Sequence, residues 1–215
     1  MEYLHLALIL LLSYLVGSFP TSIVAGRVFF GTDIRRHGSG NAGGTNAVRV
    51  FGWPAGIAVI LLDIAKGVVA VLLIARLPVF GEMGTPLLPA DAVALAAGCA
   101  AVVGHIWTVF ASFRGGKGVA TAAGMVAALY PAAFAVTLPF FVLAVALSGI
   151  VSVGSLTAAV VFAISVLALD ATGAAIVSPL LRWVALAIAL LIIYTHRSNI
   201  ARLARGEEKR MFGRR

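Results

Sequence analysis

The sequence predicts an all-α, polytopic membrane protein with about seven transmembrane helices, its N-terminus outside and its C-terminus in the cytoplasm. Of its 215 residues, 61% are hydrophobic and 11% are charged, whereas a soluble domain has about 25% charged residues. Apolar runs recur along the whole chain, and a membrane-spanning helix needs about 20 such residues. Short polar segments between the runs carry most of the basic residues. We therefore expect a single integral membrane domain over residues 1–215.

The charge and the cysteine content narrow the class of protein further. In so apolar a chain, the formal net charge of +8 indicates orientation in the membrane and anionic ligands or lipid headgroups, not nucleic acid. The one cysteine, Cys99, lies in an apolar run. It excludes an internal disulfide framework and a cysteine-based zinc site, and we expect it to be a packing residue.

The first span is expected at residues 3–24, with a kink at Pro20 because proline interrupts helical hydrogen bonding. No Lys or Arg precedes Arg27. A cleavable signal has a basic region at its start, so we expect this span to be retained. The following loop, residues 27–53, contains four arginines and one acidic residue, Asp33. That balance predicts a cytoplasmic loop.

The second span begins near Pro54 and extends to about Ala75, and it contains two ionisable residues. Asp63 and Lys66 are three positions apart and share one helix face. Ionisable side chains within a span usually face the protein interior or a water-filled site. Two interpretations stay open: a structural ion pair, and a cationic wall of a phosphate site steadied by Asp63. Residues 77–89 then form an outer loop that is acidic in character.

A third span is expected at residues 90–103, followed after a polar block by thirty apolar residues at 119–148. One span there would place the basic C-terminus outside, which the positive-inside rule opposes. We therefore expect two short helices that break near Pro131. Spans at 151–169 and 179–194 complete the count. Of the 16 basic residues, the cytoplasmic side then holds four in residues 27–53, two in residues 104–118 and seven in the tail.

The longest polar passage before the tail runs from Gly38 to Gly52 and is called here the first glycine segment. Four glycines fall in its first seven residues. Glycine lets backbone N–H groups turn toward an anion without steric cost, so the segment can form a nest for phosphate. The alternative is a flexible connector, although linkers rarely need two Asn and an Arg so close together. The side chains expected at the anion are those of Ser39, Asn41, Thr45, Asn46 and Arg49.

The second glycine segment, residues 104–121, also suits a phosphate. Arg114 and Lys117 flank a pair of glycines, and the next helix begins just after them. Backbone donors at a helix start, together with a lysine, form a natural phosphate cradle, although the spacing is not that of a Walker A loop. Trp107 and Phe110 are expected to be anchors at the membrane interface. The predicted phosphate-binding residues here are Gly115, Gly116, Lys117 and Gly118, with His105 and Thr121 as further candidates.

The C-terminal tail, residues 196–215, starts at the end of the last span. On a helix, His196, Asn199 and Arg202 share one face. The alternative is a solvated, lipid-contacting basic helix end, which suits the arginines better than His196 and Asn199 at the membrane boundary. With the two glycine segments, the tail would place several cations at the cytoplasmic face, enough for two phosphates.

Several kinds of chemistry lack their sequence signature. The chain has no Asp-rich divalent-metal motif, no H-E-x-x-H and no dinucleotide fingerprint. No histidine is followed by Asp at the fifth position, so the His-x-x-x-x-Asp pattern of many acyltransferases is absent. We therefore expect no metal site and no cofactor.

Taken in order, four blocks resemble the bacterial PlsY family, the acyl-phosphate-dependent glycerol-3-phosphate acyltransferases. The resemblance extends over the whole chain, and the four blocks together are highly specific. One departure is Ala42-Gly43-Gly44, where the family more often has another order of small residues. The blocks are Gly38-Ser39-Gly40-Asn41 with Thr45-Asn46 and Arg49; Asp63-x-x-Lys66-Gly67; Gly104-His105 with Gly115-Gly116-Lys117-Gly118-Val119-Ala120-Thr121; and His196-x-x-Asn199-Ile200-x-Arg202-Leu203 with Gly206 and Glu208.

The resemblance implies transfer of an acyl group from acyl phosphate to sn-glycerol 3-phosphate, giving lysophosphatidate and phosphate. Both substrates carry phosphate, which accounts for the cations, and the acyl chain accounts for the membrane setting. The implied location is the bacterial inner membrane, with the active site at the cytoplasmic face. The implied partners are acyl phosphate, glycerol 3-phosphate, membrane lipid and a soluble acyl-phosphate synthase, and not nucleic acid.

The resemblance and the residue types together predict roles for individual residues, and the family itself points to Ser39, Arg49, Gly115, Gly116, Gly118, His196 and Asn199. Ser39, His196 and Asn199 are the catalytic candidates, and His196 would orient or deprotonate the attacking hydroxyl. Glu208 and Asp63 would be structural, with Glu208 pairing with a tail arginine. Phosphate would be bound by Arg49, Asn41, Thr45, Asn46, Lys66, Gly115, Gly116, Lys117, Gly118 and Arg202.

Three alternatives remain at this point. Ser39 could carry the acyl group covalently, which requires an activating base within reach. A phosphate or organophosphate transporter would share the cation-lined segments, but its site would lie near the midplane with access from both sides. A structural membrane subunit would leave the glycine segments unexplained.

Overall fold

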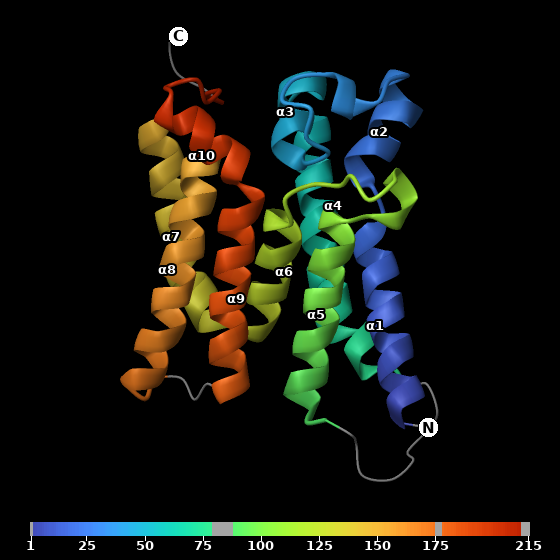
Figure 1. Ribbon diagram of the computed structural model, residues 1–215, viewed down its shortest axis with the longest axis vertical. Coiled ribbons are helices and arrows are strands. Elements are labelled where there is room, and N and C mark those ends of the chain that lie inside the picture. The colour runs from blue at the N-terminus through green and yellow to red at the C-terminus, as the bar shows by residue number, and fades with distance from the viewer. Residues whose placement is uncertain (1, 79–87, 175–177, 212–215) are drawn as a thin grey trace. The chain divides into compact units, whose positions relative to one another are not determined.

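A computed structural model describes residues 2–78, 88–174 and 178–211, and every regular element in these ranges is a helix. The chain divides into two compact units, Met1–Leu129 and Tyr130–Arg215. The first unit carries both glycine segments, and the second carries the C-terminal tail. Figure 1 colours the units from blue to green and from yellow to red.

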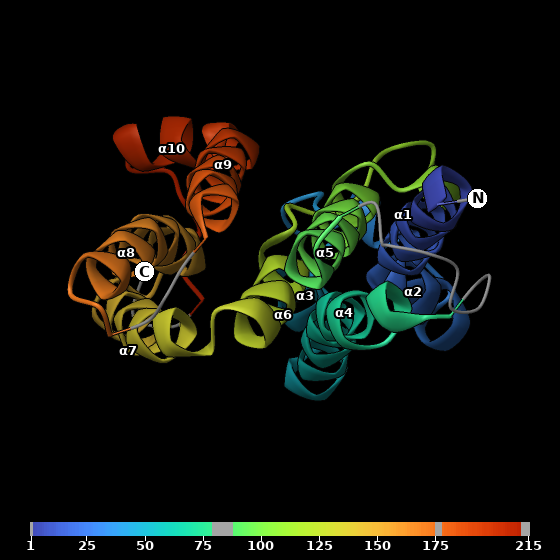
Figure 2. The same ribbon diagram turned by 90° about the horizontal axis from the view of Figure 1, so that it is seen from below.

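In residues 2–78 and 88–129 of the first unit, six α-helices and three short 3-10 turns alternate with the polar segments. The long helix α1 packs along α5, and α4 packs along α6. The shorter α3 lies against α4, and Figure 2 shows these neighbours end-on. The elements are α1 (Glu2–Ser18), α2 (Thr21–Phe30), η1 (Ile34–Arg36), α3 (Gly44–Phe51), α4 (Trp53–Leu72), η2 (Ile74–Arg76), α5 (Ala90–Ile106), η3 (Val109–Ala111) and α6 (Val119–Leu129).

Small residues explain why these helix pairs lie so close. A Cβ atom on Gly67 of α4 would lie 2.1 Å from the carbonyl oxygen of Thr121, and one on Gly124 of α6 would lie 2.0 Å from that of Ile64. Glycine therefore lets the two backbones touch, as small residues do in membrane helix pairs. Gly17 of α1 has the same relation to α5, where a Cβ atom would lie 2.0 Å from the carbonyl oxygen of Ala101.

The described residues of the second unit, 130–174 and 178–211, form a bundle of three long helices and a short one. Helix α7 packs on α8, and α8 packs on α9. The Tyr130 hydroxyl donates to the carbonyl of Leu181 at 2.8 Å, and its ring meets Phe162 edge-on. This ties the start of α7 to α8 and α9. The elements are α7 (Pro131–Ser148), α8 (Val151–Ala171), α9 (Pro179–Thr195) and α10 (Arg197–Ala204).

Two helix breaks fall where proline predicts them. Helix α1 ends at Ser18 and α2 begins at Thr21, with Pro20 between them. Helix α6 ends at Leu129 and α7 begins at Pro131, which confirms the predicted break. Pro139 does not interrupt α7.

By length and composition, five helices or helix pairs in the described ranges can cross a membrane. The pair α9 and α10 is bent by 57°, and it makes a sixth if the two helices form one span. Helix α6 is apolar but only 11 residues long, short of the roughly 20 that span a bilayer. The chain is thus a multi-pass, all-helical membrane protein, while the number of spans and their orientation stay predictions. Most of the predicted outer loop, residues 79–87, lies outside the described residues.

Candidate active site

The first glycine segment is ordered by secondary structure along most of its length. Helix α3 begins at Gly44, so Thr45 and Arg49 lie on a helix, although the sequence predicted a loop there. The face of α3 that packs inward carries Ala47 and Val48, both buried. A flexible connector is therefore not what links α2 to α4.

Asn46 holds the loop that leads into α3. Its side chain is 1% exposed. Its amide nitrogen donates to the carbonyls of Ile34, His37 and Asn41, and its amide oxygen accepts from the N–H of Ser39 at 2.8 Å. The side chain thus meets four backbone groups. These contacts favour a structural role for Asn46 over the predicted contact with phosphate, which stays a prediction.

Ser39 is an exposed residue of this loop, and its backbone N–H is held by the bond to Asn46. The glycine before it leaves room for Asn46, because a Cβ atom on Gly38 would lie 2.2 Å from the amide oxygen of Asn46. Gly40 has φ +74°, a conformation that other residues rarely adopt. Asn41, Thr45 and Arg49 are partly buried.

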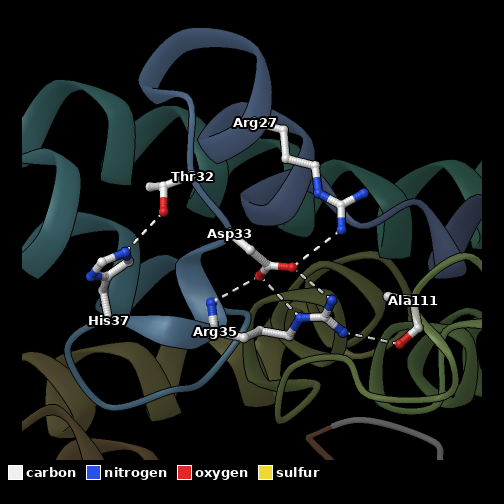
Figure 3. Close-up of polar contacts among 6 residues, drawn as sticks. All are labelled: Arg27, Thr32, Asp33, Arg35, His37 and Ala111. Atoms are coloured by element: carbon white, nitrogen blue, oxygen red, sulfur yellow. Dashed lines mark hydrogen bonds and ion pairs between the residues drawn. The ribbon is translucent and has the colours of Figure 1, made fainter.

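A charged cluster just before the first glycine segment connects it to the second (Figure 3). Arg35 donates from Nε and Nη2 to the Asp33 carboxylate at 3.0 and 2.7 Å, and from Nη1 to the carbonyl of Ala111 at 3.1 Å. Arg27 adds a longer bond to Asp33 at 3.2 Å. The hydrogen bond from Arg35 holds the pKa of Asp33 well below its ordinary value, despite partial burial.

The second glycine segment folds back on the end of α5. The N–H groups of Gly115 and Gly116 donate to the carbonyls of Ile106 and His105, each at 3.1 Å. A Cβ atom on Gly116 would lie 2.2 Å from Nε2 of His105, so the glycine makes room for the imidazole. The N–H groups of both glycines already donate to carbonyls of α5, which favours a packing role for this pair. The predicted contact of the two glycines with phosphate stays a prediction.

Lys117 precedes the start of α6, as the sequence predicts. The next residue, Gly118, has φ +82° and turns the chain into the helix, and Lys117 is partly buried. In the first turn of α6, Thr121 is fully buried, and its hydroxyl has no hydrogen-bond partner within the described part of the chain. Trp107 and Phe110 are exposed, which suits membrane-interface anchors.

A buried ionic network lies beneath the two segments. Lys66 donates to Asp63 and to the carbonyl of Phe19, both at 2.6 Å. Thr21 also donates to Asp63, at 2.8 Å, and Nδ1 of His105 lies 3.7 Å from it. Because Lys66 is only 6% exposed, the geometry favours the structural ion pair over the cationic wall, and the predicted phosphate contact of Lys66 stays a prediction. His105 is a member of this network.

In the second unit, the C-terminal tail turns around Glu208. Its carboxylate accepts from Ser152 at 2.9 Å, from Asn199 and, at 2.6 Å, from Nε of Arg202. Burial by itself would raise the pKa of Glu208, but the hydrogen bonds from Arg202, Asn199 and Ser152 outweigh it and lower the pKa. The predicted pairing of Glu208 with a tail arginine is therefore confirmed.

His196 stands at the bend between α9 and α10. It is 2% exposed, and its Nδ1 lies 2.8 Å from the carbonyl oxygen of Ile192. Asn199 is also buried and lies on α10, one turn later. The predicted meeting of this tail with the two glycine segments at one site stays a prediction.

The contacts of Asp33 and Arg35, which link the two glycine segments, were not predicted from the sequence, where both residues counted only as loop charges. A signal was present in the sequence, because an Asp at the N-cap of a short turn with Arg two positions later is a local pairing pattern. In the ranges 2–78, 88–174 and 178–211, no group of three or more His, Cys, Asp or Glu residues is arranged to hold a metal ion.

Comparison with known proteins identifies the family. The profile described as glycerol-3-phosphate acyltransferase matches residues 7–206. Proteins named glycerol-3-phosphate acyltransferase from Chlorobaculum parvum and Chlorobaculum tepidum are both 45% identical, over 96% of this chain and 97% of each relative.

Two crystal structures of PlsY, described as an integral membrane glycerol 3-phosphate acyltransferase, share the fold. The glycerol 3-phosphate form has a TM-score of 0.81 and 35% identity, covering 97% of this chain and 96% of that one. The lysophosphatidic acid form has a TM-score of 0.76 and 33% identity, covering 97% and 95%. None of these comparisons supports the transporter alternative. The chain therefore belongs to the glycerol-3-phosphate acyltransferase family.

Proposed function

We propose that this membrane acyltransferase moves a fatty acyl group from an acyl phosphate to the 1-hydroxyl of sn-glycerol 3-phosphate. The hydroxyl oxygen forms an ester bond with the acyl carbon, and the bond from that carbon to the phosphate oxygen breaks. The products are lysophosphatidate and inorganic phosphate. The hydroxyl proton passes to a base on the enzyme and then to the solvent or the departing phosphate.

The observation that carries this proposal is the pair of ligand forms in which its structural relative was solved. That relative is described in a glycerol 3-phosphate form and in a lysophosphatidic acid form. These two molecules differ by one fatty acyl ester, so they are the acceptor and the product of an acyl transfer. The proposed donor, an acyl phosphate, is the one that the resemblance to the PlsY family implies.

An acyl phosphate suits the residues that this chain offers. It is a mixed anhydride and already activated, so the reaction needs no metal, no coenzyme A and no cysteine nucleophile. The predicted phosphate ligands Arg49 and Lys117 would hold phosphate oxygens, while Ser39, Asn41 and Thr45 would donate to phosphate or to the developing oxyanion. The fixed backbone of Ser39, held by Asn46, supports this because preorganised donors stabilise a transition state best.

His196 is the proposed base. When its Nδ1–H donates to the carbonyl of Ile192, which lies 2.8 Å away, Nε2 is the basic nitrogen of the ring. That tautomer is the one that accepts a proton from a hydroxyl. Asn199 and Arg202, anchored by Glu208, would keep α10 in register with His196.

Direct transfer and a covalent acyl-Ser39 intermediate make different predictions. Incubation with acyl phosphate alone, followed by mass spectrometry of the intact protein, detects an acyl-enzyme if one forms. We expect none under single-turnover conditions, because no described base contacts the Ser39 hydroxyl. An adduct that is lost in Ser39→Ala would establish the covalent route instead.

The proposed setting is the bacterial inner membrane, with the reaction at the cytoplasmic face. The distribution of basic residues supports it, because they cluster in the segments that the positive-inside rule assigns to the cytoplasm. An acyl phosphate hydrolyses readily in water, so a soluble acyl-phosphate synthase close to the membrane would supply it.

The deciding experiment uses purified protein in detergent. Phosphate release from palmitoyl phosphate is measured with and without glycerol 3-phosphate, with no metal and no coenzyme A added. We expect release to depend on glycerol 3-phosphate, with lysophosphatidate formed in equal amount. Release without the acceptor would mean hydrolysis, and no release by folded protein would reject acyl phosphate as the donor.

A further inference from the structure

The turn after η3 adopts a backbone conformation that its residues disfavour. Ser112 has φ +55° and Phe113 has φ +58°, and they are the only described residues other than glycine with positive φ. Side chains with a Cβ atom rarely adopt this conformation, and two in succession are rarer still. Such residues persist only where the surrounding structure holds them in place, and they cluster at functional sites.

The turn leads directly into Arg114, the glycine pair and Lys117, so its shape sets where the second glycine segment begins. Its upstream side is anchored by Thr108, whose hydroxyl donates to the carbonyl of Ser18 and whose carbonyl accepts from the N–H of Phe113. The other anchor is Ala111, whose carbonyl accepts from Arg114 N–H at 3.2 Å and from Arg35 at 3.1 Å.

Arg35 also lies close to the start of the first glycine segment, three residues before Gly38. It belongs to η1, whose Ile34 is fully buried in one apolar cluster with Ala42 and Ala111. The two glycine segments approach again nearby, where a Cβ atom on Gly116 would lie 3.2 Å from the carbonyl oxygen of Ala42. One guanidinium therefore joins the chain just before Ser39 to the turn just before Lys117.

We propose that Arg35 is a positioning residue for acyl transfer, which holds the Ser112–Phe113 turn and thereby sets the second glycine segment against the first. The inference rests on the proposed function, since it assigns Lys117 and Ser39 to substrate. Asp33 aligns the guanidinium by binding two of its nitrogens, which leaves the third directed at Ala111. A lysine at this position keeps the charge but lacks the planar fork.

The chain provides a matched control in Arg27. It pairs with the same carboxylate, at 3.2 Å, and carries the same charge. Its side chain is 64% exposed, against 27% for Arg35. The structure places its guanidinium on Asp33 and away from Ala111 (Figure 3).

The test compares kcat and KM for palmitoyl phosphate and glycerol 3-phosphate in wild type, Arg35→Ala, Arg35→Lys and Arg27→Ala. We expect both Arg35 variants to lose about tenfold or more in kcat/KM, with a raised KM for at least one phosphorylated substrate, because small misplacements of binding groups are costly. Arg27→Ala should stay within about twofold of wild type. A merely structural role would lower the folded fraction, and hence kcat alone.

A second variant tests the link to the turn. Ser112→Gly accepts positive φ without strain, so it should leave wild-type activity nearly unchanged and should recover about threefold or more of the activity lost in Arg35→Ala. Full activity in Arg35→Lys, equal activity in Arg35→Ala and Arg27→Ala, or no recovery by Ser112→Gly would each overturn the proposal. If Arg35→Ala does not fold, Arg35→Lys and its Ser112→Gly double variant decide the question.

The proposed function and the positioning role of Arg35 can be contradicted separately. Wild-type protein without phosphate release that depends on glycerol 3-phosphate contradicts the proposed function, whatever Arg35 does. Active wild type with unaffected Arg35 variants contradicts only the positioning role.

Discussion

Within the first glycine segment, neighbouring polar side chains have different tasks. Asn46 is buried and meets four backbone groups, whereas Ser39 is exposed. The sequence predicted both side chains at one anion, Ser39 as a catalytic candidate and Asn46 as a phosphate ligand, because residue type and spacing do not show which side chain turns inward. Which side chain turns inward depends on the path of the loop, and carbonyls at 34, 37 and 41 define that path.

This contrast predicts that only the substitution of Asn46 lowers stability. Asn46→Ala leaves several buried backbone groups without partners, each costing about 1–3 kcal/mol, and should lower both the melting temperature and the activity. Asn46→Asp should be as damaging, because a carboxylate offers the three carbonyls no donor. Ser39→Ala should abolish most activity and leave the melting temperature unchanged. Thermal unfolding in detergent, followed by tryptophan fluorescence, measures the first effect. A stable, inactive Asn46→Ala would instead assign this residue to the chemistry.

Asp33 predicts a defined dependence of stability on pH. Because Arg35 holds its folded-state pKa below the ordinary value, the carboxylate contributes stability at neutral pH that is lost as the pH falls through the unfolded-state pKa, near 3.9, toward the folded value. The difference in melting temperature between wild type and Asp33→Asn should therefore be constant from about pH 8 to 5 and shrink below about pH 4. A difference that grows on acidification would contradict the ion pair.

At the scale of helices, local rules predicted the breaks but not every element. The helix breaks at Pro20 and Pro131 were predictable because proline lacks a backbone N–H and its ring clashes with the preceding turn of a helix. Helix α3 was missed, because a run that begins with glycines has poor helix propensity. Packing overrides that propensity: α3 lies so close to α4 that a Cβ atom on Gly56 would come within 2.5 Å of the Val48 nitrogen. Such a contact joins two elements and has no signature in either one alone.

The pairing of α4 with α6 gives a prediction at this scale. In Gly67→Ala, the new methyl group meets the backbone of Thr121, so the helices must separate, and we expect a loss of about 2–3 kcal/mol or more. Gly173→Ala is the control, since Gly173 has positive φ but no atom within 4 Å of the added methyl group. It should cost only about 1 kcal/mol. Denaturant titration of the two variants in mixed micelles compares them, and equal losses would show that helix contact is unimportant.

For the molecule as a whole, sequence predicts the membrane class and the family more securely than the topology. Hydrophobic content alone identifies a multi-pass protein, since few soluble chains reach 61%. Orientation depends on a small bias of charges between loops, and the short helix α6 makes the number of crossings sensitive to a single element.

A topology experiment follows from that bias. In a Cys99→Ala background, single cysteines are placed at the exposed positions Arg76, Ser112 and Ser198 and treated in spheroplasts with a membrane-impermeant maleimide. We expect Arg76→Cys to react at once, and Ser112→Cys and Ser198→Cys only after lysis, because both lie in basic segments. Labelling of Ser198→Cys before lysis would reverse the predicted location of the C-terminus.

Glu208 has a consequence for how the protein is made. Its three side-chain partners, Ser152, Asn199 and Arg202, are all synthesised before it, and the N–H of Met211 then closes onto the carbonyl of Gly149. Every candidate span is therefore translated and can insert before the carboxylate that anchors α10 exists. A gene interrupted after codon 205 would yield a chain that has all its hydrophobic segments and can integrate into the membrane. That chain would lack the Glu208 contacts that anchor α10. We expect such a chain to be less stable than the full-length protein and to be degraded faster in cells.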